Sequence, residues 1–191
     1  MTTVYFVRHA QPNCDNHDDA TRELSEKGLK DRKLVSDFLM DKDIGLVFSS
    51  PYKRAVDTVS DFAERNNLPV ITLDAFRERK VADGWLEDFQ SFCQRQWENF
   101  HYKLFDGECL EEVQRRNILA LEHILTMYKG QNIVVGSHGT ALSTIINHYD
   151  KSFGYADFAR IKDVMPWIVA FTFEGKECIQ IRQFDLLSSQ M

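Results

Sequence analysis

Short apolar runs recur along the chain, each bounded by polar or turn-forming residues and separated from the next by a stretch with helical spacing. Four of these runs lie at residues 4–7, 44–48, 69–73 and 132–136. They are too short for helices and rich in Val, Ile, Leu and Phe, which is typical of strands buried on both faces. Buried strands that alternate with helices favour a mainly parallel sheet covered on both sides. The sequence therefore predicts an α/β fold, a three-layer α/β/α sandwich with a mainly parallel central sheet.

The segments between the predicted strands carry signals for helix starts. Ser25 is a predicted N-cap for a helix whose apolar residues extend to Leu39. Ser50 and Pro51 predict the N-cap and the first residue of a second helix, which runs to about Asn66. The helices are therefore expected to begin just beyond the carboxyl ends of strands.

The second half of the chain predicts a long amphipathic helix at 110–128 and an antiparallel hairpin at one edge of the sheet, formed by 167–173 and 178–181. The pattern is looser at about 77–107, which is expected to be a short, mostly helical lid inserted into a single domain of residues 1–191. Aromatic residues are concentrated in this lid: Trp85, Phe89, Phe92, Trp97, Phe100, Tyr102 and Phe105. We expect most of them to form the lid's own packing core.

The charge balance limits the partners that the chain can bind. There are 23 Lys and Arg residues against 29 Asp and Glu residues, which gives a formal net charge of −6. A broad surface for nucleic acid or anionic membrane is not expected, because those partners attract basic proteins. Any cationic site for an anion must therefore be local.

Other general features point to a reducing compartment. The four cysteines show no paired spacing, and no apolar run approaches the roughly 20 residues that a membrane span needs. The amino terminus has no basic segment followed by an apolar stretch of signal-peptide length. We expect a cytoplasmic protein, and the sequence leaves open whether two copies form a homodimer.

Two histidines occupy matching positions. His9 follows the run at 4–7, and His138 follows the run at 132–136. Ligands of open parallel sheets bind outside the carboxyl ends of the strands. If these two strands are parallel neighbours, both imidazoles reach the same edge of the sheet. A single histidine in such a place is usually structural, but two indicate a site.

Two arginines belong to the same predicted edge. Arg8 precedes His9, and Arg54 lies in the first turn of the helix that follows the run at 44–48. Guanidinium groups bind phosphate oxygens in a bidentate manner, and free amides at helix N-termini add to the attraction. The sequence therefore predicts a pocket for a doubly charged tetrahedral anion.

The residues at this edge resemble the histidine phosphatase, or phosphoglycerate-mutase-like, superfamily. The matching blocks occur in the family's order and extend over nearly the whole chain: VRHA at 7–10, LSEKG at 24–28, SSPYKRAVDT at 49–58, FRE at 76–78, GE at 107–108 and GSHG at 136–139.

The resemblance assigns roles to individual residues. It implies that His9 is the nucleophile, which attacks phosphorus in line and forms a phosphohistidine intermediate. It also implies that Arg8, Arg54 and His138 bind the phosphoryl oxygens and that Gly139 is a further phosphate-binding residue. Glu78 matches the proton donor for the leaving group. In the acid-phosphatase branch an Asp follows the second histidine, and Gly139 at that place argues against that branch.

The loop at 11–23 departs from the family pattern. Pro12 and Asp15 stand where branch members commonly carry a hydroxyl and an Asn. Asn16 and Arg22 are the substrate-binding residues that we expect from this loop.

The resemblance therefore implies that the chain is a phosphomonoester hydrolase that acts on a small phosphorylated metabolite. The alternatives are a phosphoglycerate mutase and a module that binds phosphorylated ligands without turnover. The short lid favours hydrolysis, since mutases of the family tend to be longer. We expect no metal and no other cofactor, because the remaining histidines show no ligand-like spacing.

Overall fold

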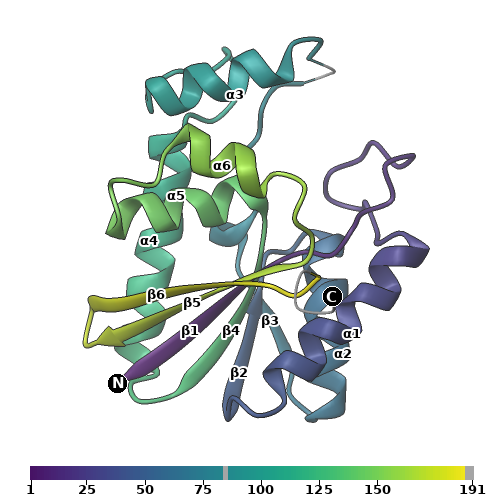
Figure 1. Cartoon of the computed structure of the whole chain (residues 1–191), viewed down its shortest axis with the longest axis vertical. Helices are drawn as coiled ribbons and strands as arrows, with labels where there is room; N and C mark the ends of the chain where they lie inside the picture. The colour runs from purple at the N-terminus through teal and green to yellow at the C-terminus, as the bar shows by residue number, and fades with distance from the viewer. Residues whose placement is uncertain (84–85, 188–191) are drawn as a thin grey trace.

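The computed structural model describes residues 1–83 and 86–187, and they form a six-stranded sheet with helices on both faces (Figure 1). The strand order is β3-β2-β4-β1-β5-β6. The strands are β1 (Thr2–Arg8), β2 (Ile44–Ser49), β3 (Val70–Thr72), β4 (Asn132–Ser137), β5 (Trp167–Glu174) and β6 (Glu177–Asp185). The first four are mutually parallel, and β5 and β6 form the antiparallel hairpin at one edge. The predicted α/β class and the mainly parallel sheet are confirmed.

Burial on both faces explains the unbroken apolar runs. In β1, Val4 and Phe6 join one hydrophobic core, whereas Tyr5 and Val7 join the other core on the opposite face. This division follows from the alternation of side chains along a strand. A central strand in a three-layer fold therefore has no polar face.

The helices form the two outer layers. Two of them, α1 and α2, pack together and contribute Val35 and Phe62 to one core, while α4 and α5 contribute Leu121 and Ile145 to the other (Figure 1). The helices are α1 (Glu26–Leu39), α2 (Lys53–Arg65), the 3₁₀ helix η1 (Asp74–Phe76), α3 (Phe89–Glu98), α4 (Leu110–Met127), α5 (Gly139–Tyr149) and α6 (Tyr155–Ile161). None of the helices in the described residues has the length and apolar character needed to cross a membrane.

One predicted helix start is confirmed and the other is wrong. Ser25 caps α1, because its Oγ accepts a hydrogen bond from the Gly28 amide at 3.1 Å. Helix α2 begins at Lys53 with Tyr52 as N-cap, so Ser50 and Pro51 lie before it. Ser50 Oγ instead accepts from the amide of Tyr52 at 3.2 Å, before the helix begins, and lies 2.7 Å from Nε2 of His138.

The lid contains one helix, α3, and its remaining described residues are loop or turn. Trp97 is buried against Phe100, Phe153 and Phe158, which anchors α3 over α6. Phe105 is fully exposed instead. The expectation of a lid core therefore fits Trp97 but not Phe105, and Trp85 lies outside the described residues.

Candidate active site

The two histidines meet at the carboxyl ends of neighbouring strands. Strand β1 pairs with β4 in parallel, with Arg8 opposite Ser137, and the His9 amide continues this ladder by donating to the Ser137 carbonyl at 3.1 Å. The imidazole rings of His9 and His138 then lie edge to face, with centroids 5.3 Å apart. Both residues are buried. The predicted pairing of the two rings is thus present in the structure.

The hydrogen bonds of His9 fix the tautomer of its ring. Nδ1 lies 2.8 Å from the Ala10 carbonyl oxygen, which can only accept, so Nδ1 carries the proton. Nε2 therefore keeps its lone pair, and it accepts a hydrogen bond from Arg54 Nε at 3.2 Å. Burial lowers the pKa of His9 well below its usual value of 6.5, and the charges of Arg54 and Arg8 lower this pKa further. His9 presents a neutral nitrogen nucleophile at neutral pH.

Arg54 lies in the first turn of α2, as predicted, with a side chain that is 4% exposed. Its Nη1 donates to the Asp19 carbonyl at 2.6 Å, and its Nη2 lies 3.4 Å from the Asp19 carboxylate. The guanidinium also lies over the ring of Tyr52, at 5.2 Å from its centroid. These contacts hold Arg54 beside the nucleophile.

Arg8 is held by main-chain carbonyls. Its Nη1 donates to Ile161 O at 2.6 Å and Val164 O at 3.1 Å, and its Nη2 donates to Lys162 O at 2.7 Å. Its buried Nε has no partner among the described residues. Burial lowers the pKa of Arg8 to about 10, an effect that the nearby Glu78 carboxylate partly offsets. Arg8 stays a cation at neutral pH, and its Nε–H is left to offer.

Gly139 lies against Arg8. A Cβ built on Gly139 would come within 3.1 Å of the guanidinium carbon of Arg8. The first residue of α5 therefore has to lack a side chain for the guanidinium to occupy its place beside the histidines. The structure brings Gly139 to the predicted edge, next to a predicted phosphate ligand.

His138 is the N-cap of α5, and its ring is fastened by Ser50. Its Nδ1 is buried and has no partner in the described residues. Burial lowers the pKa of His138 well below 6.5, and Arg54 and His9 add to this lowering. Two donor-capable atoms, Arg8 Nε and His138 Nδ1, are thus buried without partners at the same edge of the sheet. Buried polar atoms are normally hydrogen-bonded, which makes this pair a mark of a ligand site.

Glu78 reaches the amino terminus of α5. Its Oε2 accepts from the Thr140 amide at 3.1 Å, and its Oε1 accepts from the Ala141 amide at 3.2 Å and from the Arg79 amide at 2.8 Å. Burial lowers the pKa values of Arg8 and Arg54, and the charge of Glu78 opposes this lowering. The structure therefore places the charge of Glu78 near Arg8 and Arg54.

The contacts of Glu78 correct one expectation about the helix N-termini. We expected free amides to help bind the anion, but Glu78 uses two amides of α5, and the Lys53 amide of α2 donates to Ala20 O at 2.9 Å. These three amides are therefore not free to bind an anion. Arg8 and Arg54 supply the charge.

The loop at 11–23 places its two predicted residues differently. Asn16 donates through Nδ2 to Glu23 at 2.9 Å and accepts from the Asp18 amide at 3.0 Å, so its amide is used within the loop. Arg22 donates to Asn16 O at 2.6 Å, and its charge acts on both His9 and Arg54. The structure thus brings Arg22 toward the site, while Asn16 stabilises the loop.

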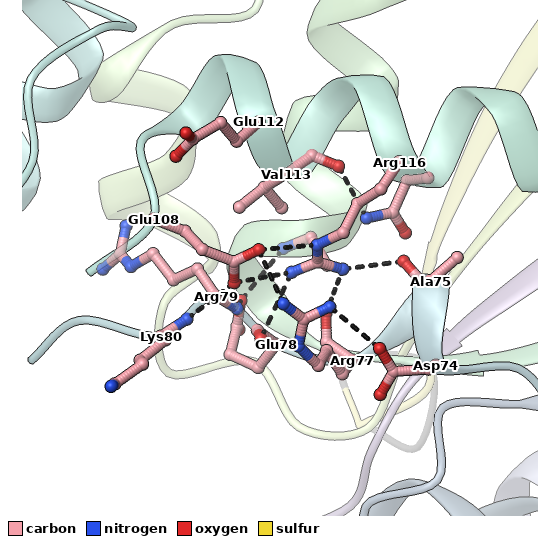
Figure 2. Close-up of polar contacts among 12 residues, drawn as sticks. Asp74, Ala75, Arg77, Glu78, Arg79, Lys80, Glu108, Glu112, Val113 and Arg116 are labelled. Atoms are coloured by element: carbon pink, nitrogen blue, oxygen red, sulfur yellow. Dashed lines mark hydrogen bonds and ion pairs between the residues drawn. The ribbon is translucent and has the colours of Figure 1, made fainter. Parts of the chain in front are cut away.

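Two features of the site escaped the sequence reasoning. Asn13 and Asn16 both bind the carboxylate of Glu23, and these bonds lower the pKa of Glu23. The guanidinium of Arg116 binds the segment that carries Glu78 (Figure 2). Neither Glu23 nor Arg116 lies at the end of a strand, so no positional signal singled them out.

In residues 1–83 and 86–187 no group of three or more His, Cys, Asp or Glu residues could hold a metal ion.

The fold and the site define a class of protein: an α/β protein that brings a neutral histidine and two arginines together at the carboxyl edge of its sheet. A model of the histidine phosphatase superfamily (branch 1) matches residues 4–178. The chain belongs to this superfamily, and the predicted membership is confirmed.

Similar proteins agree with this assignment. The chain is 33% identical over 153 residues to phosphoserine phosphatase 1 of Hydrogenobacter thermophilus, covering 72% of this chain and 71% of that protein. It is 29% identical over 161 residues to phosphoglycerate mutase-like protein 4 of Arabidopsis thaliana, covering 74% and 68%. Among solved structures, YhfR of Bacillus stearothermophilus superposes with a TM-score of 0.79 at 20% identity, covering 93% of this chain and 94% of that one.

Proposed function

We propose that the chain hydrolyses small phosphomonoesters through a phosphohistidine at His9. The observation that carries this proposal is the state of the His9 ring, whose Nδ1–H donates to Ala10 and whose Nε2 lone pair faces Arg54. A buried, neutral imidazole with a fixed tautomer is a ready nucleophile. The membership in the superfamily and the phosphatase relative support the same reaction.

In the first step, Nε2 of His9 attacks phosphorus, the N–P bond forms and the bond to the leaving oxygen breaks. Arg54 and the free Nε of Arg8 bind the phosphoryl oxygens. Nδ1 of His138 is a third donor. When the Ser50 hydroxyl donates a hydrogen bond to Nε2, Nε2 is the unprotonated nitrogen of the neutral ring, so Nδ1 carries the proton and can donate to a phosphoryl oxygen. Glu78 gives a proton to the leaving oxygen. In the second step water attacks phosphorus, a new O–P bond forms and the N–P bond to His9 breaks, while Glu78, now a carboxylate, takes a proton from this water and inorganic phosphate leaves.

The lid supports hydrolysis over mutase activity. Its lysines are engaged by acids, since Lys80 pairs with Asp83 at 2.7 Å and Lys103 pairs with Glu112 at 2.7 Å. Few unpaired cations are therefore offered to the carboxylate of a phosphorylated sugar acid. Such an intermediate is retained poorly, and water becomes the acceptor.

The test measures both acceptors. The purified enzyme is incubated with a panel of phosphomonoesters that includes phosphoserine and 3-phosphoglycerate, with and without EDTA. We expect inorganic phosphate from several esters, the same rate after chelation, and little 2-phosphoglycerate. Rapid interconversion of the two phosphoglycerates without free phosphate would establish the mutase instead. Binding of esters without any turnover would make the chain a phospho-ligand-binding module.

We also propose that the enzyme is located in the cytoplasm. Cys14, Cys93, Cys109 and Cys178 are all free thiols. Free thiols are usual in reducing compartments, which supports a cytoplasmic location.

A further inference from the structure

Arg116 extends from α4 to the segment that carries Glu78 (Figure 2). Its Nη1 donates to Ala75 O at 2.7 Å and to Arg77 O at 2.8 Å, and its Nη2 donates to Glu78 O at 3.3 Å. One guanidinium therefore binds three carbonyls. Those of Ala75 and Arg77 precede the proposed proton donor, and the third belongs to Glu78 itself.

Glu108 completes this cluster. It accepts from Arg116 Nε at 3.0 Å and from Arg116 Nη2 at 3.2 Å (Figure 2). It also accepts from Arg77 Nη2 at 2.8 Å and from the Lys80 amide at 3.0 Å. Glu108 thus binds the chain on both sides of Glu78.

The contacts of Arg116 leave it no direct part in binding the substrate. A guanidinium has five N–H donors, and the five hydrogen bonds of Arg116 use one from Nε, two from Nη1 and two from Nη2. Its side chain and that of Glu108 are each 16% exposed. Burial disfavours the charge on Glu108, but the hydrogen bonds from Arg116 and the Lys80 amide outweigh it and lower the pKa of Glu108. Glu108 stays ionised at neutral pH.

The segment that carries Glu78 needs such support. Residues 77–83 are neither helix nor strand, so no regular backbone ladder fixes them. The Glu78 carboxylate nevertheless has to meet the amides of Thr140 and Ala141 across the site. A displacement of about 1 Å can slow a reaction by roughly 10²-fold when it misplaces a catalytic group.

We propose that Arg116 is a positioning residue that fixes Glu78 for proton transfer through the carbonyls of residues 75, 77 and 78, with Glu108 holding Arg116 in place. This inference rests on the proposed function of Glu78 as the proton donor. It predicts a defect confined to reactions that need the proton.

The test compares leaving groups in matched variants. Arg116→Ala is measured beside Arg115→Ala, which removes the neighbouring, exposed arginine of the same helix. For Arg116→Ala we expect kcat/KM on alkyl phosphates such as phosphoserine to fall roughly 10–10²-fold. The kcat/KM for p-nitrophenyl phosphate, which reports formation of the phosphoenzyme from a leaving group that needs little proton help, should change less than about 3-fold. Arg115→Ala should match the wild type on both substrates.

A double mutant separates positioning from a general loss of structure. In the Glu78→Gln background, Arg116→Ala should add little to the loss on alkyl phosphates, because the group that it positions is already inactive. Equal losses on both kinds of substrate, or losses that multiply in the double mutant, would overturn the positioning role. If Arg116→Ala does not fold, Glu108→Gln takes its place, with the same expected pattern and the same contrary outcomes.

Failure of the proposed function gives a different result. If Glu78→Gln alone hydrolyses alkyl and aryl phosphates with equal loss or none, Glu78 is not the proton donor, and both proposals fall. If Glu78→Gln slows alkyl phosphates selectively while Arg116→Ala does not, only the positioning role is lost.

Discussion

The Nε of Arg54 lies 3.2 Å from Nε2 of His9, so the guanidinium donates to the nitrogen that would attack phosphorus. The same cation opposes protonation of His9, because a second positive charge at this distance is unfavourable. Besides burial, this contact therefore favours the neutral form of the proposed nucleophile and places a proposed phosphate ligand beside it. The arrangement links the chemistry of the site to its behaviour with pH.

The stability of the protein should depend on pH through the buried histidines. The folded-state pKa of both His9 and His138 lies below 6.5, so the unfolded chain binds more protons as the pH falls below that value. The free energy of unfolding is then fully retained above about pH 6.5 and declines below it. Urea unfolding of the wild type and of His9→Gln between pH 7.5 and 5 measures this decline. The variant should lose less stability than the wild type over this range, and parallel curves for the two proteins would contradict the assignment.

Substitution of the nucleophile should abolish turnover without unfolding the protein. In His9→Ala, brief incubation with a radiolabelled phosphomonoester should leave no acid-labile, alkali-stable phosphate on the chain, whereas the wild type should be labelled. His123→Ala is the matched control, since His123 is exposed on α4. A folded His9→Ala enzyme with wild-type activity would exclude the phosphohistidine mechanism.

The space beside Gly139 should be essential to the site. A Cβ at this position would lie 3.1 Å from Cζ and Nε of Arg8, and the carbonyls of Ile161, Lys162 and Val164 leave the guanidinium little room to move. Gly139→Ala should therefore lower kcat/KM at least roughly 10-fold, the cost expected of a misplaced binding group.

A second glycine serves as the control for this substitution. At Gly154, also next to the start of a helix, the nearest atom to a built Cβ is 4.0 Å away. Gly154→Ala should keep wild-type activity. If Gly139→Ala also keeps wild-type activity, the close approach of Arg8 to Gly139 is not needed for catalysis.

Much of the fold and the centre of the site could be predicted from the sequence because local patterns determine them. The strands that carry His9 and His138 are buried on both faces, so their apolar runs are unbroken, and the parallel order β4-β1 brings their ends together. The family blocks then located Arg54 and Glu78. These residues lie at or just beyond the ends of regular elements, where sequence signals are strong.

The remaining contacts arise between segments far apart in the chain. Arg116 binds the carbonyl of Ala75 across 41 positions, and no periodicity marks such a contact. The sequence signal predicted that the Ser50 hydroxyl caps a helix, whereas in the structure it accepts from the Tyr52 amide and lies beside an imidazole 88 positions away. Only the folded arrangement decides between partners of this kind.

The last prediction concerns this hydroxyl and the matching serine before it. Ser50 Oγ lies 2.7 Å from His138 Nε2 and accepts from the Tyr52 amide at 3.2 Å, so its one proton is available for His138. Ser50→Ala leaves Nε2 without this donor and removes the reason for Nδ1 to carry the proton toward the phosphate. We expect a fall in kcat/KM of roughly 10-fold or more, the cost of losing about one hydrogen bond to a developing charge.

Ser49 provides the control, because its Oγ is buried without a hydrogen-bond partner in the described part of the chain. Ser49→Ala removes the same atom from the adjacent residue and should leave the phosphatase rate and the affinity for vanadate, a mimic of in-line transfer, unchanged. Ser50→Ala should weaken vanadate binding together with the rate, since both depend on the donor at Nδ1. Equal effects of the two substitutions would show that Ser50 acts through packing alone, and His138 would then owe its orientation to its position at the start of α5.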